Sequence, residues 1–182
     1  MRNFVPNDFN VDDINQVTEL FDKLNDEVIA NDAESLRNWI MKWSELGSVL
    51  SEVSCRRYVA MTLNTADVSA AEAYENFVEK VDPISSEYSD KLNRKLMSHP
   101  AKDALKGEFN VWFKSIQVSL DLFSKENIPL ETEETKAVQA YQKITGAMSV
   151  EFDGKPQTMQ QLSAYLERTE RAIRDKALRA MW

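Results

Sequence analysis

Cys55 and His99 are the chain's one cysteine and one histidine, and they are its one conceivable pair of nucleophile and general base. Such a pair is catalytic when the sulfur and a ring nitrogen lie within hydrogen-bond reach and a third group orients the base. Arg56 and Arg57 follow the cysteine and favour a reactive thiolate. Nothing in the spacing brings Cys55 and His99 together, however, and small cysteines on helices commonly serve in packing. We therefore interpret Cys55 as a packing residue and predict no catalytic residue in this chain.

Carboxylates are the candidate metal ligands, and they occur in two short clusters. These are Asp12 and Asp13 near the start, and Glu131, Glu133 and Glu134 later in the chain. A calcium loop needs alternating acidic ligands, a glycine turn and a distal glutamate, and no segment has this pattern. We expect the glutamates in or near the first turn of a helix, where the helix dipole favours anions. The sequence predicts no metal ligand and no cofactor-binding residue.

Two further groups of side chains have binding chemistry. A basic cluster is interleaved with Asp90, Asp103 and Glu108 and interrupted by Pro100, which favours a solvated helix face over a phosphate site. Two aromatic pairs either line a peptide groove or pack in the core, and their helical spacing favours the core. The basic residues are Lys91, Arg94, Lys95, Lys102 and Lys106, and the aromatic pairs are Trp39 with Trp43 and Trp112 with Phe113.

Composition limits the classes of function. The 182 residues suit one domain or one lobe of a larger protein, and 43% of them are apolar. The net charge of −8 disfavours binding to nucleic acids and to anionic membranes. No apolar run approaches the roughly 20 residues that span a bilayer, and the first residues lack an apolar signal region. One cysteine excludes an internal disulfide, so we expect a soluble, cytoplasmic protein.

The elements that position these residues are expected to be helices. Only four glycines and five prolines interrupt a chain rich in helix-forming residues. The apolar spacing predicts a mainly α array of about six to eight helices in a single lobe (1–182), after an extended leader (1–10). The expected helix starts are Asp12 or Asp13, Asn31 or Asp32, Ser69, and a resumption after a break at Pro83. Gly47 lies inside the second helical pattern and predicts a kink or close packing there.

One segment departs from the helical period. Residues 148–157 alternate around Asp153-Gly154, which is the strongest hairpin signal in the sequence. Val150 and Phe152 give this small hairpin one apolar face to bury. Because a lone hairpin is marginal in water, it must pack on helices or pair with another strand. Thr158 and Thr169 are expected to cap two final helices, and the apolar stripe of the last one still runs at Trp182, which predicts a chain that stops within a helix.

Several phrases of the chain resemble the N-terminal region of oligoendopeptidase F, a family of thimet-type zinc metallopeptidases. The most specific phrase is 141–154, within a similar run from 126 to 182, and further similar phrases are residues 2–9, 56–62 and 77–83. The resemblance implies a mostly helical fold whose N-terminal lobe walls a deep channel for short peptides. It also implies a zinc site built from a His-Glu-x-x-His helix far downstream. This chain, with His99 followed by Pro100, has no counterpart of that motif, so no catalytic or metal residue carries over.

Three readings follow from the resemblance. The first is a non-catalytic N-terminal part of a zinc oligopeptidase, inactive alone, whose partner is the rest of the peptidase chain. The second is a free-standing helical module that binds peptides or another protein, and the third is one half of a split peptidase whose complementary subunit supplies the zinc. A self-contained hydrolase ranks last because the chain lacks a nucleophile, a base and a metal set.

Overall fold

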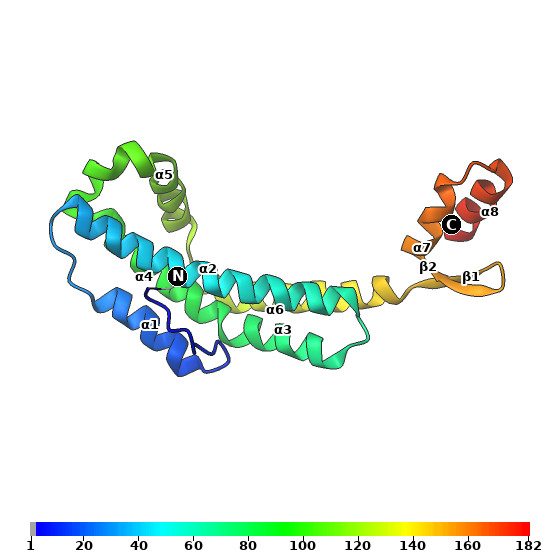
Figure 1. The fold of residues 1–182 in the computed structure, drawn as a ribbon, viewed down its shortest axis with the longest axis horizontal. Coiled ribbons are helices and arrows are strands. Elements are labelled where there is room, and N and C mark those ends of the chain that lie inside the picture. Colours follow the sequence, from blue (N-terminus) through cyan, green and yellow to red (C-terminus); the bar gives the residue numbers. More distant parts are fainter. Residues whose placement is uncertain (1–2) are drawn as a thin grey trace.

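The computed structural model describes residues 3–182 as a helical body that continues through one long helix into a small C-terminal unit (Figure 1). The mainly helical class with one two-stranded hairpin is confirmed. The elements of the body are α1 (Ile14–Asp26), α2 (Ala33–Leu63), α3 (Val68–Lys80), α4 (Asp82–Ser98), a 3-10 helix (Pro100–Leu105) and α5 (Lys106–Leu122). After α6 (Asn127–Ala147) come β1 (Ser149–Phe152), β2 (Lys155–Thr158), α7 (Met159–Ser163), a second 3-10 helix (Ala164–Glu167) and α8 (Arg171–Met181).

The main core lies where α1, α2, α4 and the first 3-10 helix meet. Its fully buried side chains recur at helical spacing, as the sequence predicts, because one stripe of each helix faces its neighbours. They include Val17, Leu24, Leu36, Trp39, Leu46, Leu92 and Leu96. The leader joins this core through Val5, and Val11 follows it into the core. The backbone N–H groups of residues 3–5 donate to the Glu45 carboxylate at 2.8–3.0 Å. Met1 and Arg2 of the predicted leader lie outside the described residues.

Helix starts follow capping chemistry. Asp13 caps α1 and Asp32 caps α2, each accepting a backbone N–H with its carboxylate, as expected. The third start is different, because Asp67 and not Ser69 is the cap of α3. The expected break at Pro83 is confirmed, since α3 ends at Lys80 and the proline lies in the first turn of α4.

One expectation about the helices is wrong, and another holds only in its weaker form, that the glutamates lie near the first turn of a helix and not in it. Gly47 lies within a continuous α2, and a Cβ added there would meet nothing within 4 Å, so it marks neither an interruption nor close packing. The helix after α5 begins at Asn127, so Glu131, Glu133 and Glu134 come after its first turn. The favourable dipole interaction at a helix N-terminus falls off within the first turn, and it does not explain these three carboxylates.

The C-terminal unit has its own small core. Asp153 (φ 53°) and Gly154 (φ 76°) make the hairpin turn, and Ser149 pairs with Thr158 at the open end. Thr158 caps α7, as predicted, and forms a capping box with Gln161, whereas α8 is preceded by Glu170 and not by the expected Thr169. Phe152, Leu162 and Ala177 are its buried residues.

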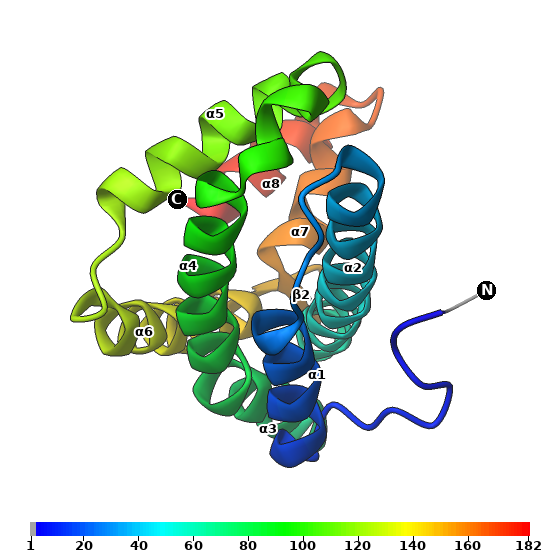
Figure 2. The same ribbon diagram turned by 90° about the vertical axis from the view of Figure 1, so that its left-hand side faces the viewer.

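Helix α6 connects the two parts of the molecule. It packs along α3 and α4, and the C-terminal unit lies beyond its end, apart from α1 and α5 (Figure 1). Seen from the end of the molecule, α3 lies below α2 and α6, and α5 lies at the top (Figure 2). Within residues 3–182, no helix is both long and apolar enough to cross a membrane.

A candidate binding groove along α2

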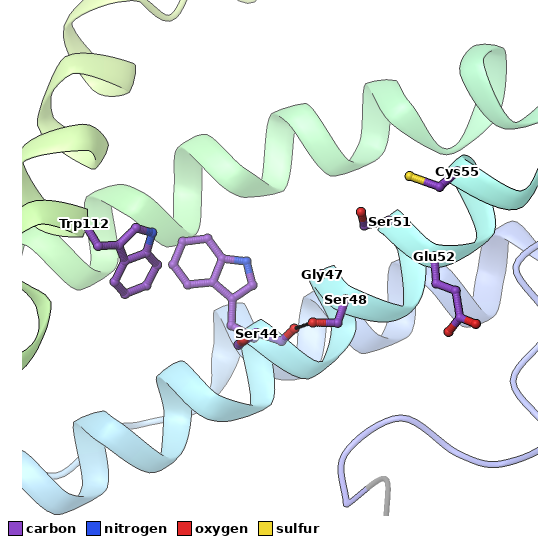
Figure 3. Close-up of a pocket in the computed structure, with 8 residues that line it drawn as sticks. Ser44, Gly47, Ser48, Ser51, Glu52, Cys55 and Trp112 are labelled. Atoms are coloured by element: carbon purple, nitrogen blue, oxygen red, sulfur yellow. Dashed lines mark hydrogen bonds between the residues drawn. The ribbon is translucent and has the colours of Figure 1, made fainter. Parts of the chain in front are cut away.

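An open groove of about 650 Å³ follows one side of α2, and Trp112 of α5 closes one end. Its lining is made of two indoles and a row of small polar side chains: Trp43, Ser44, Gly47, Ser48, Ser51, Glu52, Cys55 and Trp112. Positions 44, 47, 48, 51 and 55 fall on one side of an α-helix because its period is 3.6 residues. Figure 3 shows Ser51 and Cys55 on the same side of α2 as Trp112.

The four tryptophan and phenylalanine candidates divide between the core and this groove. Trp39 is fully buried, and its indole N–H donates to the Leu24 carbonyl oxygen at 2.9 Å. Phe113 is also buried, as the helical spacing predicts. Trp43 and Trp112 are half-buried with ring centroids 5.7 Å apart, and both line the groove. Trp39 and Phe113 are therefore core residues as the spacing favours, while Trp43 and Trp112 pack against the core and also line the groove, and its use by a peptide stays a prediction.

Cys55 is exposed, so its interpretation as a packing residue is wrong. The side chain borders the groove, whereas its neighbours Arg57 and Tyr58 on α2 contact α3. No histidine lines that groove. The His99 ring is used locally, because its Nδ1 accepts the backbone N–H of Ala101 at 3.2 Å and caps the 3-10 helix. The structure does not bring the two side chains together as a nucleophile and base.

The acidic candidates are dispersed. Asp12 pairs with Arg57 at 2.8 Å, and Asp13 caps α1. Among residues 3–182, no group of three or more histidine, cysteine, aspartate or glutamate side chains is arranged to hold a metal ion.

The basic cluster is engaged within the chain. Arg94 pairs with Asp90 at 2.8 Å, Lys106 pairs with Asp103 at 2.9 Å, and Lys102 donates to the Met97 carbonyl oxygen at 3.1 Å. Lys95 donates to three backbone carbonyl oxygens, and partial burial lowers its pKa. A solvated helix face with local partners describes Arg94, Lys102 and Lys106, whereas Lys95 is half-buried against the end of α1.

The groove suits recognition of an extended, largely neutral chain. Its hydroxyl groups can exchange hydrogen bonds with peptide groups, and the two indoles offer flat apolar surface. Ser48 already donates to the Ser44 carbonyl oxygen at 2.8 Å, and Glu52 pairs with Arg56 at 2.8 Å. The lining therefore has no charged group that lacks a partner, and it contains no base next to Cys55. It can bind, and it offers no set of groups for catalysis.

Comparisons with known proteins give a family for most of this body. The profile of the peptidase M3 N-terminal domain matches residues 4–123. The fold is similar to the solved structure "PZ peptidase A with inhibitor 2", with a TM-score of 0.75 and 23% sequence identity. That similarity covers 100% of this chain and 31% of the peptidase chain, so this chain spans about a third of its length. At this identity the likeness is one of fold. No match was found among curated protein sequences.

Proposed function

The chain belongs to the peptidase M3 N-terminal domain family, and we propose that it is the non-catalytic N-terminal part of a zinc-dependent oligopeptidase. In this proposal it walls the channel in which short peptides are hydrolysed. The observation that carries the proposal is the family match over residues 4–123, joined to a fold that corresponds to about a third of a peptidase chain. The specificity of oligoendopeptidase F and a cytoplasmic location belong to the same proposal.

Zinc, the metal of this peptidase family, does not fit the residues of this chain. A catalytic zinc site takes three protein ligands, commonly two histidines and a carboxylate, and leaves a position for water. The chain has one histidine, and its Nδ1 is committed to the backbone of Ala101. The hydrolytic centre must therefore come from the rest of the peptidase, either in the same polypeptide or in a complementary subunit.

The groove along α2 is our candidate for the part of the channel wall that this lobe supplies. Short peptides offer backbone donors and acceptors that match the hydroxyls of Ser48 and Ser51. Trp43 and Trp112 can hold an apolar side chain of the peptide at one end.

The mass of the native product tests the proposal most directly. An immunoblot of the source cells with an antibody against this chain should show a band well above 20.9 kDa. A band at that mass that co-purifies with a polypeptide carrying the His-Glu-x-x-His motif would instead establish the split peptidase. A band at that mass without such a partner would contradict the proposal, and the free-standing binding module would be the remaining hypothesis.

The role of the groove has its own test in the peptidase-sized product. Ser51→Phe fills the groove from its floor and should raise KM for a short peptide several-fold while kcat changes little. Ala60→Phe on an exposed part of α2 is the matched control and should leave both constants unchanged. If Ser51→Phe and Ala60→Phe have the same KM and kcat, the groove is not part of the channel wall.

A further inference from the structure

Helix α6 has its polar side against the body and its apolar side toward solvent. On the polar side, Gln139 Nε2 donates to the Ala71 carbonyl oxygen at 3.4 Å and Gln142 Nε2 donates to the Tyr58 hydroxyl at 3.1 Å. Lys136 pairs with Glu79 at 2.6 Å and with Glu75 at 3.4 Å. Ile128 is the buried residue of this 21-residue helix. A surface helix normally buries its apolar stripe, so this arrangement is reversed.

The outward side of α6 carries a regular apolar seam. Leu130, Tyr141, Ile144 and Met148 are 60%, 66%, 67% and 48% exposed, and Ala137 is also exposed. The seam residues at 137, 141, 144 and 148 are separated by four, three and four positions, and residue 130 lies one heptad before 137. This is the a/d spacing with which one helix packs along another. The seam covers 18 residues of rise, or roughly 27 Å.

The heptad numbering also explains the side that touches the body. Gln139 occupies an f position, Lys136 a c position and Gln142 a b position when Tyr141 is an a position. In a coiled coil these positions face away from the partner helix. The body therefore holds α6 by the side that a helical partner would leave free, and the seam stays available to that partner.

The N-terminal half of the seam carries unpaired negative charge. Glu131 is an e position and Glu133 a g position beside the seam, whereas Glu134 is an a position and interrupts the apolar seam between Leu130 and Ala137. Within residues 3–182, the side chains of these glutamates make no ion pair or hydrogen bond. Residues at e and g choose the partner of a helix through complementary charge. In a parallel pair, a second copy of α6 would place its glutamates against these glutamates. In an antiparallel pair, the glutamates would face the uncharged Val138 and Ala140. A second copy of α6 therefore lacks the complementary positive charge.

We propose that the seam is the docking site of an amphipathic helix with Lys or Arg beside its apolar stripe, supplied by the rest of the M3-type peptidase. This assignment rests on the proposed function for the source of the helix. The apolar seam supplies the area that is buried on docking, and the glutamates fix the register and direction of the docked helix. The docked helix lies along the outward side of α6, opposite the side that contacts the body.

Site-specific photo-cross-linking in the native product tests this assignment. Tyr141→benzoylphenylalanine places the cross-linker in the middle of the seam without adding charge. Lys143→benzoylphenylalanine places it at an exposed c position of the same helix and is the control. Cross-linked peptides are identified by mass spectrometry, and a Glu133→Lys/Glu134→Lys variant is irradiated in parallel.

The expected product joins residue 141 to a helical segment that has a/d apolar spacing and basic flanks, in a polypeptide that carries the His-Glu-x-x-His motif. The charge-reversed variant should lower its yield several-fold. A cross-link to α6 of a second copy, or a yield no higher than that of the Lys143 control, would overturn the docking assignment. If the cross-linked helix belongs to a polypeptide without the zinc motif, the assignment to a peptidase is overturned, and the proposed function fails with it. A peptidase-sized product without the cross-link overturns the docking site alone.

Discussion

Lys95 shows how a single side chain closes the body. Its Nζ donates to the carbonyl oxygens of Leu24, Asn25 and Glu27 at 2.6–3.0 Å, where α1 ends and leaves those groups without helical partners. The ammonium also lies 5.5 Å from the Trp39 ring centroid. The residue belongs to a cluster that the sequence presents as a solvated face, yet it joins α1, α2 and α4.

We predict that Lys95→Met lowers the free energy of unfolding by about 2 kcal/mol, because partly buried carbonyl oxygens lose charged donors. Chemical denaturation followed by circular dichroism measures the effect. Lys91→Met is the matched control, since Lys91 is exposed and its ammonium lies over the Tyr88 ring, and it should cost about 0.5 kcal/mol. Equal losses for the two variants would show that Lys95 does not cap α1.

Tyr88 provides a pH-dependent contact between α4 and α1. Its hydroxyl donates to the Asp22 carboxylate, and this hydrogen bond, followed by burial, raises the pKa of Tyr88 to about 12. A folded-state pKa above the unfolded value of 10.0 means that the contribution to stability is complete below pH 10 and is lost as the pH rises toward 12.

Tyr88→Phe should therefore lower the free energy of unfolding by about 1 kcal/mol at pH 8, after allowance for solvent screening of this half-buried contact. The difference from the unmodified protein should shrink between pH 10 and pH 12. Denaturation curves at several pH values measure it. A pH-independent difference for Tyr88→Phe would contradict the hydrogen bond.

At the scale of elements, Gly47 tests a prediction that the structure contradicts, because the sequence predicts a kink or close packing and the structure has a continuous helix with free space beside it. Glycine inside a helix costs about 1 kcal/mol relative to alanine, and a Cβ there would meet nothing within 4 Å. We predict that Gly47→Ala stabilises the chain by about 1 kcal/mol, measured as a shift in the denaturation midpoint. Gly146→Ala in α6 is the comparison, because its Cβ would approach Thr65 Cγ2 at 3.2 Å and offset the gain. If Gly47→Ala instead lowers the stability of the protein, the kink or close packing predicted from the sequence would be supported.

Most helix starts and turns could be predicted because they depend on neighbouring residues. Burial, the groove and the orientation of α6 could not, because they depend on packing between distant segments. The cap Asp32, the break at Pro83 and the Asp153-Gly154 turn depend on neighbouring residues, so the sequence shows them directly. Burial of Cys55 was mispredicted because its side of α2 borders the open groove while α3 packs on another side of the same part of α2, and no local signal shows which side is covered. The sequence also did not show which aromatic residues line the groove, because Trp43 and Trp112 lie 69 positions apart and are brought together only by the fold. The reversed orientation of α6 also depends on tertiary contacts.

At the scale of the whole molecule, stability is divided between two cores of different size. The body buries side chains from α1, α2, α4 and α5, whereas the C-terminal unit buries Phe152, Leu162 and Ala177. A unit of about 35 residues with so few buried side chains is marginal by itself, because the entropy of ordering grows with length and the buried area is small. The unit should therefore open more readily than the body.

We predict that Leu162→Ala unfolds the C-terminal unit and leaves the body folded. Leu162 is fully buried, and truncation of a buried leucine costs about 2–5 kcal/mol, which is more than such a small core supplies. Hydrogen exchange with mass spectrometry should show loss of protection in residues 149–181 and unchanged protection in α1, α2 and α4. Leu92→Ala, the matched change in the main core, should instead lower protection throughout the body. If Leu162→Ala unfolds α1 through α4 as well, the two cores form one cooperative unit, and α6 transmits stability between them as well as connecting them.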